Sequence, residues 1–380
     1  MSKAYGRARP VRGGAKYDIV VIGLTISSSW GNCHASAYRG LLSELVKSGY
    51  KVLFLERENR EFFARRDLEK HACFKTEFYT SLKELKKKYS AAVEHAQLVI
   101  MGSSVIEGAA AGEWVCSIAK GIAAFYDMDT PLTIKNLDVK CYEYLSAHLI
   151  PRFDLYLSFA GGMALDLLEN AYGSPMARPL YCSVDFSKYY PDEKDSRLYD
   201  LGYMGTYSEC RKEPLETLML EAAKKWTEGR FAVAGASYPD EISWPSNIKK
   251  MDHLFASHHR DFYCSQRFTL NITKAENAEA GYAPSIRLFE AAACGVPIIS
   301  DYWEGLSNFF IFGEEILLSS SSRNTHKYLT EIPEQKRREI GDAARKRVLT
   351  EHSPAHRVRE LEEYMKEALR VKQRKRAKFF

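Results

Sequence analysis

Buried β-strands and helices alternate along this chain, and this alternation limits the possible fold more than any other feature. The apolar stretch YDIVVIGL (17–24) is followed by a polar loop, a helical stretch (35–50) and the apolar stretch KVLFLE (51–56). Further strand-like stretches lie at 96–104, 122–131, 153–159 and 177–185. Strands that are joined through helices pair in parallel, so the pattern predicts a parallel sheet in an α/β fold.

A polar, turn-rich segment (186–197) ends this first set of strands and predicts a linker. A second set of strands and helices then follows, at 199–208, 214–226, 230–239, 260–273, 285–294 and 296–300. The 380 residues, 46% of them hydrophobic, are enough for two cores. We therefore expect two facing, doubly wound Rossmann-like domains, with ligands bound in the cleft between the carboxyl ends of their strands. The expected ranges are a basic flexible lead (1–15), an N-terminal domain (16–190), a C-terminal domain (198–350) and a helix with a basic tail (351–380).

The composition argues against several classes of protein. No apolar run approaches the roughly 18 residues of a membrane span, and no secretory signal opens the chain, so a cytoplasmic protein is expected. None of the eight cysteines forms a CxxC motif, so a zinc site is not predicted. The formal net charge of +5 comes from the two ends, which can contact DNA or an anionic membrane or can simply be solvated. The basic residues at these ends are Lys3, Arg7, Arg9, Arg12, Lys16, Arg370, Lys372, Arg374, Arg376, Lys375 and Lys378.

The loop after the first strand ends in His34 and lacks the GxGxxG pattern of dinucleotide-binding proteins, which disfavours a nicotinamide enzyme. An imidazole at a helix start can face the cleft, or it can serve in capping and packing. Asp127 and Asp129 follow a later strand, in YDMDTP. Such a pair can hold a metal with a diphosphate, but turn capping is at least as good an explanation, and no metal is predicted. We keep His34 and Asp129 as candidate catalytic residues.

One carboxylate, Glu290, falls on the apolar face of the helix within YAPSIRLFEAAACGVPIISD (282–301). A buried carboxylate needs a partner, which is either Arg287 one turn earlier or the hydroxyl groups of a ligand. Pro284 and Ser285 start this helix, and a helix start attracts phosphate. Anion and hydroxyl sites would then be adjacent.

The loop GTYSECRKEP follows the first strand of the second domain. Gly205 and Thr206 supply backbone and hydroxyl donors, and Arg211 supplies a cation, which together suit a diphosphate. A Gly-Thr pair alone is weak evidence. The pair becomes stronger evidence for a diphosphate site because it lies in the same predicted domain as the helix that carries Glu290.

Together these stretches resemble the GT-B superfamily of glycosyltransferases, most closely the CgeB-like (spore maturation protein B) branch. The similar segments lie within about residues 17–350 and read GLTISSSWGNCHASAYRGLL, FYDMDTPLT, FDLYLSFAGG, LYCSVDFSKYYP, SQRFTLNIT and YAPSIRLFEAAACGVPIISDYWEGL. The resemblance implies a metal-independent, hexosyltransferase-like enzyme. It would use a nucleotide-diphosphate sugar as co-substrate and no other cofactor, with the donor in the C-terminal domain and the acceptor in the N-terminal domain.

The resemblance also implies roles for single residues. Glu290 would bind the ribose hydroxyls of the donor, and His34 would lie near the acceptor. The diphosphate would lie between two groups of donor-binding residues, which are Pro284, Ser285 and Arg287 on one side and Gly205, Thr206 and Arg211 on the other.

Two positions depart from the pattern of the superfamily. Tyr282 stands where many retaining members have a glutamate, and Cys33 stands where glycine is commoner in this branch. If His34 acts as base, the enzyme inverts the anomeric centre. If Tyr282 only orients the donor and the acceptor attacks from the leaving-group side, the enzyme retains the configuration. A nucleotide-sugar epimerase, and a non-catalytic nucleotide-sugar-binding or coat-assembly protein, are the alternatives. The acceptor is left open among a saccharide, a protein, a lipid-linked molecule and nucleic acid.

Overall fold

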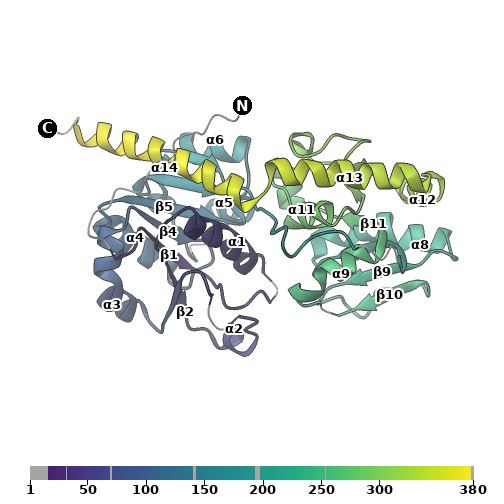
Figure 1. Ribbon diagram of the computed structural model, residues 1–380, viewed down its shortest axis with the longest axis horizontal. Coiled ribbons are helices and arrows are strands. Elements are labelled where there is room, and N and C mark those ends of the chain that lie inside the picture. Colours follow the sequence, from purple (N-terminus) through teal and green to yellow (C-terminus); the bar gives the residue numbers. More distant parts are fainter. Residues whose placement is uncertain are drawn as a thin grey trace.

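The computed structural model describes residues 16–377 apart from 31, 69–70, 140–142, 193–196 and 253. It has two halves side by side, each built on a parallel sheet (Figure 1). The first sheet has, within the described residues, the strand order β3-β2-β1-β4-β5-β6-β7. Its strands are β1 (Ile19–Gly23), β2 (Val52–Arg57), β3 (Lys75–Tyr79), β4 (Leu98–Gly102), β5 (Ile122–Asp127), β6 (Leu155–Ser158) and β7 (Ala177–Pro179).

Helices connect these strands, because strands that pair in parallel need a crossover connection between them. They are α1 (His34–Lys47), α2 (Arg60–Ala64), α3 (Leu82–His95), α4 (Gly108–Ile118), α5 (Thr130–Asp138), the 3₁₀ helix η1 (Ala147–Arg152) and α6 (Met163–Asn170). The strand order reverses direction between β1 and β4. The loop that leaves β1 therefore opens into a crevice at the carboxyl edge of the sheet.

The second sheet repeats this plan with the strand order β10-β9-β8-β11-β12-β13 in the described chain. Its strands are β8 (Tyr199–Met204), β9 (Phe231–Ala234), β10 (Ile248–Met251), β11 (Gln266–Asn271), β12 (Ile298–Ser300) and β13 (Leu317–Leu318). Its helices are α7 (Lys212–Leu215), continued by a π-helical turn (Glu216–Leu220) into α8 (Glu221–Lys225), then α9 (His259–Cys264), α10 (Ala275–Ala280), α11 (Ile286–Ala293), α12 (Ser322–Glu331) and α13 (Glu334–Glu351). Here the order reverses between β8 and β11, which places the loops after these strands at a second crevice.

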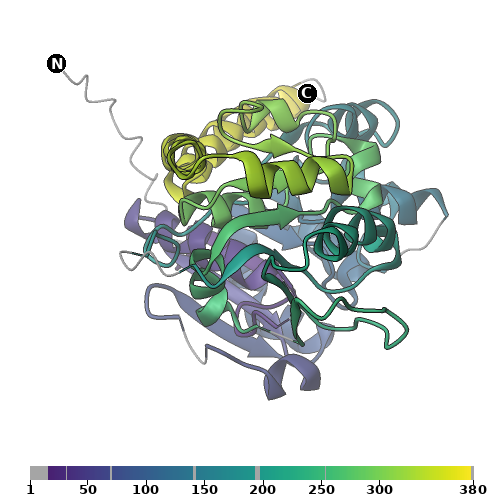
Figure 2. The same ribbon diagram turned by 90° about the vertical axis from the view of Figure 1, so that its right-hand side faces the viewer.

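The last helix, α14 (Pro354–Ala377), returns to the first half of the molecule. Figure 1 shows it running over the N-terminal sheet, and Figure 2 shows it behind α13 when the molecule is viewed from the other half. The Tyr50 hydroxyl donates to Glu362 at 3.2 Å, and Lys372 pairs with Asp154 at 2.8 Å. Lys372 was expected in a basic tail and is instead packed on the fold. The basic lead and the side chains from residue 376 onward lie outside the described residues.

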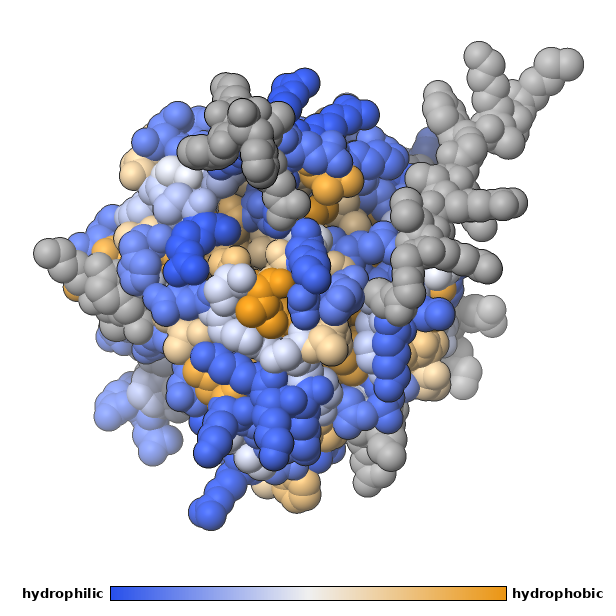
Figure 3. Space-filling view, turned by 90° about the vertical axis from the view of Figure 1, so that its left-hand side faces the viewer, coloured by the Kyte–Doolittle hydropathy of each residue, from blue (hydrophilic) through white to orange (hydrophobic). Residues whose placement is uncertain are grey.

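One hydrophobic cluster joins the two halves, because it contains side chains from β1, α1, α11 and α14. The backbone also crosses between the halves, where the Gly161 amide donates to the Tyr282 carbonyl at 3.0 Å. The face at the left end of Figure 1 is mostly hydrophilic, with small and separated hydrophobic areas (Figure 3). No helix among the described residues combines the length and apolarity that crossing a bilayer requires.

Candidate functional site

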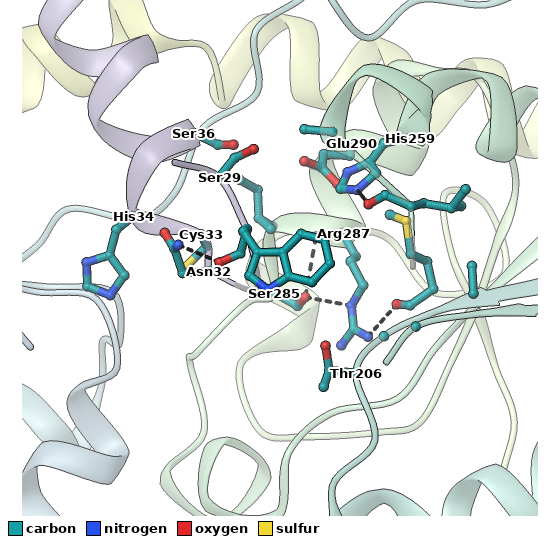
Figure 4. Close-up of a pocket in the computed structure, with 18 of the residues that line it drawn as sticks. Ser29, Asn32, Cys33, His34, Ser36, Thr206, His259, Ser285, Arg287 and Glu290 are labelled. Atoms are coloured by element: carbon teal, nitrogen blue, oxygen red, sulfur yellow. Dashed lines mark hydrogen bonds between the residues drawn. The ribbon is translucent and has the colours of Figure 1, made fainter. Parts of the chain in front are cut away.

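A cavity of about 540 Å³ opens where the two crevices meet, and it brings together most of the residues that the sequence indicated. Those that line it are His34, Asp129, Gly205, Thr206, Arg211, Ser285, Arg287 and Glu290. Figure 4 shows Glu290 and His259 side by side, Arg287 and Ser285 between them and Thr206, and His34 on the opposite side. Tyr282 and Pro284 are not among the lining residues.

Tyr282 instead forms part of the contact between the halves. Its backbone φ of 49° is left-handed, which is uncommon for a non-glycine residue. Its ring lies against Gly162 and Gly305, where any added Cβ would collide with it. The position that faces the donor in many retaining enzymes is therefore used here for packing between the halves.

Glu290 is buried, with 4% of its surface exposed, and accepts a hydrogen bond from the Tyr263 hydroxyl at 3.1 Å. Burial, together with the charge of Glu290, raises the pKa of Tyr263 well above its ordinary value, so this hydroxyl stays protonated and can donate. Among the described residues Glu290 forms no ion pair with Arg287. The proposed alternative of a local ion pair was wrong, because the Arg287 guanidinium donates instead to the Ser285 hydroxyl and to backbone carbonyls.

Arg287 donates to the carbonyls of Met204 at 2.8 Å and Ile272 at 2.9 Å, and to the Ser285 hydroxyl at 3.1 Å. Ser285 caps α11 by accepting from the Arg287 amide. These bonds fix a guanidinium at the N-terminus of α11 without neutralising it. The positive end of the helix adds to the same potential.

Arg211 lies beside Arg287 in the same cavity. It donates to the Thr206 carbonyl at 3.2 Å, while its buried Nε has no partner in the described chain. Burial, and then the charge of Arg287, lower the pKa of Arg211. Neither arginine pairs with a carboxylate within the part of the chain that the structure describes. Two partly buried, neighbouring cations without a carboxylate partner among the described residues make a strong site for an anion.

Gly205 lets these groups approach the loop after β8. A Cβ at this position would lie 2.6 Å from both the Arg287 Nη1 atom and the Tyr203 hydroxyl. Only glycine leaves room for the guanidinium beside the backbone. The Gly205 and Thr206 backbone consequently forms one wall of the anion site.

His34 begins α1 and has 7% of its surface exposed. Its Nδ1 atom is buried and has no hydrogen-bond partner among the described residues. Burial lowers the pKa of His34 to about 4, so the imidazole is neutral at pH 7. The residue is thus available as a neutral hydrogen-bonding group in the cavity.

The two aspartates of YDMDTP have different surroundings. Asp127 is fully buried and accepts from the Tyr156 hydroxyl at 2.7 Å and the Thr133 hydroxyl at 2.9 Å, and burial raises its pKa to about 6. Asp129 reaches the cavity and pairs with Lys274 of the other half at 2.9 Å. Lys274 also lines the cavity, and the sequence analysis did not identify it. Its partner is 145 residues away, so no local pattern could have indicated it.

Glu56, at the end of β2, is a second residue that the sequence analysis missed. It has 1% of its surface exposed and accepts four hydrogen bonds from the loop after β1. The donors are the Thr25 hydroxyl, the Ile26 amide, and the amide and hydroxyl of Ser27. Glu56 therefore holds the loop that leads to His34. A carboxylate ending the apolar stretch KVLFLE was the available signal.

Comparison with solved structures identifies the architecture. An Anabaena protein, HepE, in complex with UDP and glucose has 13% identity and a TM-score of 0.68, covering 92% of this chain and 100% of that chain. An alpha-glucosyltransferase in complex with UDP-glucose and DNA containing an abasic site has 13% identity and a TM-score of 0.69, covering 92% and 98%. The fold is GT-B.

Sucrose-phosphate synthase from Thermosynechococcus elongatus shares this GT-B architecture, with 13% identity, a TM-score of 0.66 and coverage of 93% of this chain and 100% of that chain. A family model described as glycosyl transferase-like matches residues 211–363. This range contains Arg211, Arg287 and Glu290. Comparison of the sequence with curated proteins finds no match.

Proposed function

We propose that this protein is a glycosyltransferase that moves a sugar from a nucleoside-diphosphate sugar to an acceptor hydroxyl in the cavity between its halves. The observation that carries the proposal is the pair of partly buried guanidinium groups, Arg211 and Arg287, which line one cavity and have no carboxylate partner in the described chain. A diphosphate would supply the missing negative charge, with the N-terminus of α11 beside it. The glycosyl transferase-like family match over 211–363 supports the same assignment. We further propose the CgeB-like branch, on the resemblance of the first-loop and Glu290 segments to it.

The other donor contacts follow from this placement of the diphosphate. Glu290 lies one helical turn beyond Arg287 and lines the same cavity, and we expect it to accept hydrogen bonds from the ribose hydroxyls. Tyr263 holds one of its oxygens at 3.1 Å. Arg211, Arg287 and the helix N-terminus would stabilise the leaving diphosphate, and the proposed reaction needs no metal ion.

His34 and Asp129 are the proposed residues at the acceptor end. With a pKa of about 4, His34 is a weak base at neutral pH, and its Nδ1 suits a hydrogen bond from the acceptor hydroxyl. Asp129 supplies a carboxylate that Lys274 holds at 2.9 Å. The acceptor oxygen bonds to the anomeric carbon, the bond from that carbon to the diphosphate oxygen breaks, and the proton of the hydroxyl passes to a nearby base.

A ligand-binding screen tests the donor site directly. UDP, GDP, CDP, dTDP and ADP are measured by thermal shift and calorimetry against the wild type, Glu290→Ala and Arg211→Gln. Because a hydrogen bond to a charged group contributes about 1.5 to 3 kcal/mol, Arg211→Gln should raise the dissociation constant roughly tenfold or more. Lys212→Gln is the matched control, since Lys212 is the adjacent residue, is exposed and does not line the cavity.

The expected result is that one diphosphate stabilises the wild type and that Glu290→Ala and Arg211→Gln weaken its binding while Lys212→Gln does not. Incubation with the matching nucleotide sugars should then release the nucleoside diphosphate. If no diphosphate binds, or if Arg211→Gln and Lys212→Gln behave alike, the donor-site assignment is wrong.

A further inference from the structure

The wall of the cavity opposite the anion site belongs to the first half of the molecule. Its chemistry differs from that of the anion site. The wall comes from the loop between β1 and α1, the segment after α2 and the segment after β5. The side chains that matter here are Trp30, His34, Arg65, Asp67 and Asp129. Together they combine one large aromatic surface with short polar and charged groups.

The charges of this wall are already paired. Asp67 pairs with Arg39 at 2.7 Å and accepts from the Ser29 hydroxyl at 2.6 Å. Although burial alone would raise the pKa of Asp67, the hydrogen bonds from Arg39 and Ser29 hold it at about 2. Asp129 is matched by Lys274 across the cavity. Arg65 pairs with Glu61 at 3.2 Å. Both carboxylates and the Arg65 cation of this wall thus already have partners of opposite charge, so its described residues offer no unpaired cation to a phosphate-rich acceptor.

Trp30 supplies the apolar surface of this wall. The Arg65 guanidinium lies 4.5 Å from the centre of its ring, and Phe255 of the other half lies 5.8 Å away at a tilt of 53°. The Asn32 side chain donates to the Trp30 carbonyl at 2.9 Å, which fixes the loop at this point. An indole held in this way can pack against the C–H face of a sugar ring while polar neighbours bind the hydroxyls at its edge.

We propose that the acceptor is a neutral saccharide, which packs against Trp30 and directs its reactive hydroxyl towards His34 and Asp129. This inference rests on the proposed glycosyltransferase function. A nucleic acid acceptor would place phosphodiesters against Asp67 and Asp129. A lipid-linked acceptor would need an apolar groove, whereas the N-terminal wall has Trp30 and Met128 among mainly polar lining residues.

The test offers the enzyme different acceptors in turn, each together with a nucleotide-sugar donor that the enzyme hydrolyses. The neutral probes are p-nitrophenyl glycosides of glucose, galactose, mannose and N-acetylglucosamine, together with maltose and cellobiose. The competing probes are duplex DNA containing hydroxymethylated pyrimidines and undecaprenyl-diphosphate-linked N-acetylglucosamine. Transfer to at least one neutral probe and to neither competing probe is expected.

Substitutions then test the role of Trp30. Trp30→Ala should raise the KM for the neutral acceptor about tenfold, because a stacked aromatic contributes about 0.5 to 1.5 kcal/mol beyond its buried area. Trp30→Phe should recover most of that loss, and the dissociation constant of the nucleoside diphosphate should stay as in the wild type. Tyr302→Ala is the control, because Tyr302 is 66% exposed and does not line the cavity.

Transfer only to DNA or only to the lipid-linked sugar would overturn the inference, and so would an acceptor KM that Trp30→Ala leaves unchanged. Donor hydrolysis without transfer to any neutral probe would also reject it, while leaving the proposed donor chemistry intact. Absence of both diphosphate binding and donor hydrolysis would reject the proposed function itself. The two failures are therefore distinguishable.

Discussion

Replacing Glu56 should separate acceptor chemistry from donor binding, because this residue holds only the first loop. Its Oε2 atom accepts from the amides of Ile26 at 2.8 Å and Ser27 at 3.0 Å, and its Oε1 atom accepts from two hydroxyls. A backbone amide cannot become an acceptor, whereas a hydroxyl can rotate and accept. Glu56→Gln can therefore keep its oxygen on the amides and direct its NH₂ group to the hydroxyls.

The two substitutions at this position should differ in stability for that reason. Glu56→Gln loses the charge but keeps the hydrogen bonds, which should cost about 1 to 2 kcal/mol of unfolding free energy. Glu56→Met leaves two buried amides without an acceptor, at about 1 to 3 kcal/mol each, so a loss of roughly 2 to 6 kcal/mol is expected. Urea unfolding measures the difference between the two variants.

The same substitutions should affect catalysis on one side of the cavity only. A displacement of about 1 Å in the loop that leads to His34 can cost roughly 100-fold in kcat/KM for the acceptor. The diphosphate site is built from the other half, so the dissociation constant of the nucleoside diphosphate, measured by calorimetry, should stay unchanged in both variants. Equal stability of Glu56→Gln and Glu56→Met, or a matching loss of diphosphate affinity, would refute this reasoning.

Three further predictions follow from the site. Because burial lowers the pKa of His34 from 6.5 to about 4, the unfolded chain binds more protons between these values, and stability falls as the pH drops through this range. Urea unfolding measures the free energy of unfolding at pH 7 and at pH 5. The decrease on going from pH 7 to pH 5 should be smaller by roughly 2 kcal/mol in His34→Asn than in the wild type. Equal decreases in the two proteins would contradict the assigned protonation state of His34. Lys274→Met should lower kcat/KM about tenfold or more. It should cost under about 1 kcal/mol of stability, because the ion pair between Lys274 and Asp129 is partly exposed. A loss of stability large enough to account for the loss of activity would indicate a structural role for Lys274. Prior treatment with EDTA should leave turnover unchanged, as Arg211, Arg287 and the α11 N-terminus supply the positive charge. A loss of turnover that added Mg²⁺ restores would count against a metal-independent reaction.

The amino-acid sequence by itself determined two parallel-sheet domains, because the alternation of apolar strands and amphipathic helices is a local property that a reader can follow along the chain. The expectation that they form a GT-B fold came from the resemblance of six segments to that superfamily. The sequence also indicated the β8 loop and the α11 segment, since a glycine loop and a helix start with Ser285, Arg287 and Glu290 are contiguous patterns. The edge strands β3, β10 and β13 were not predicted as strands. The side chains of β3 and β10 are mostly exposed or partly exposed and β13 has only two residues, so these strands lack the apolar run that marks the central strands.

Only the tertiary structure decided which of these groups work together. Arg287 and Glu290 are one turn apart, yet their partners are Met204, Ile272 and Tyr263, which the order of the strands brings to them. Glu56 reaches its loop across neighbouring strands, and Lys274 reaches Asp129 across the cavity. Such pairings depend on sheet register and on how the two halves pack, and neither leaves a periodic signal along the chain.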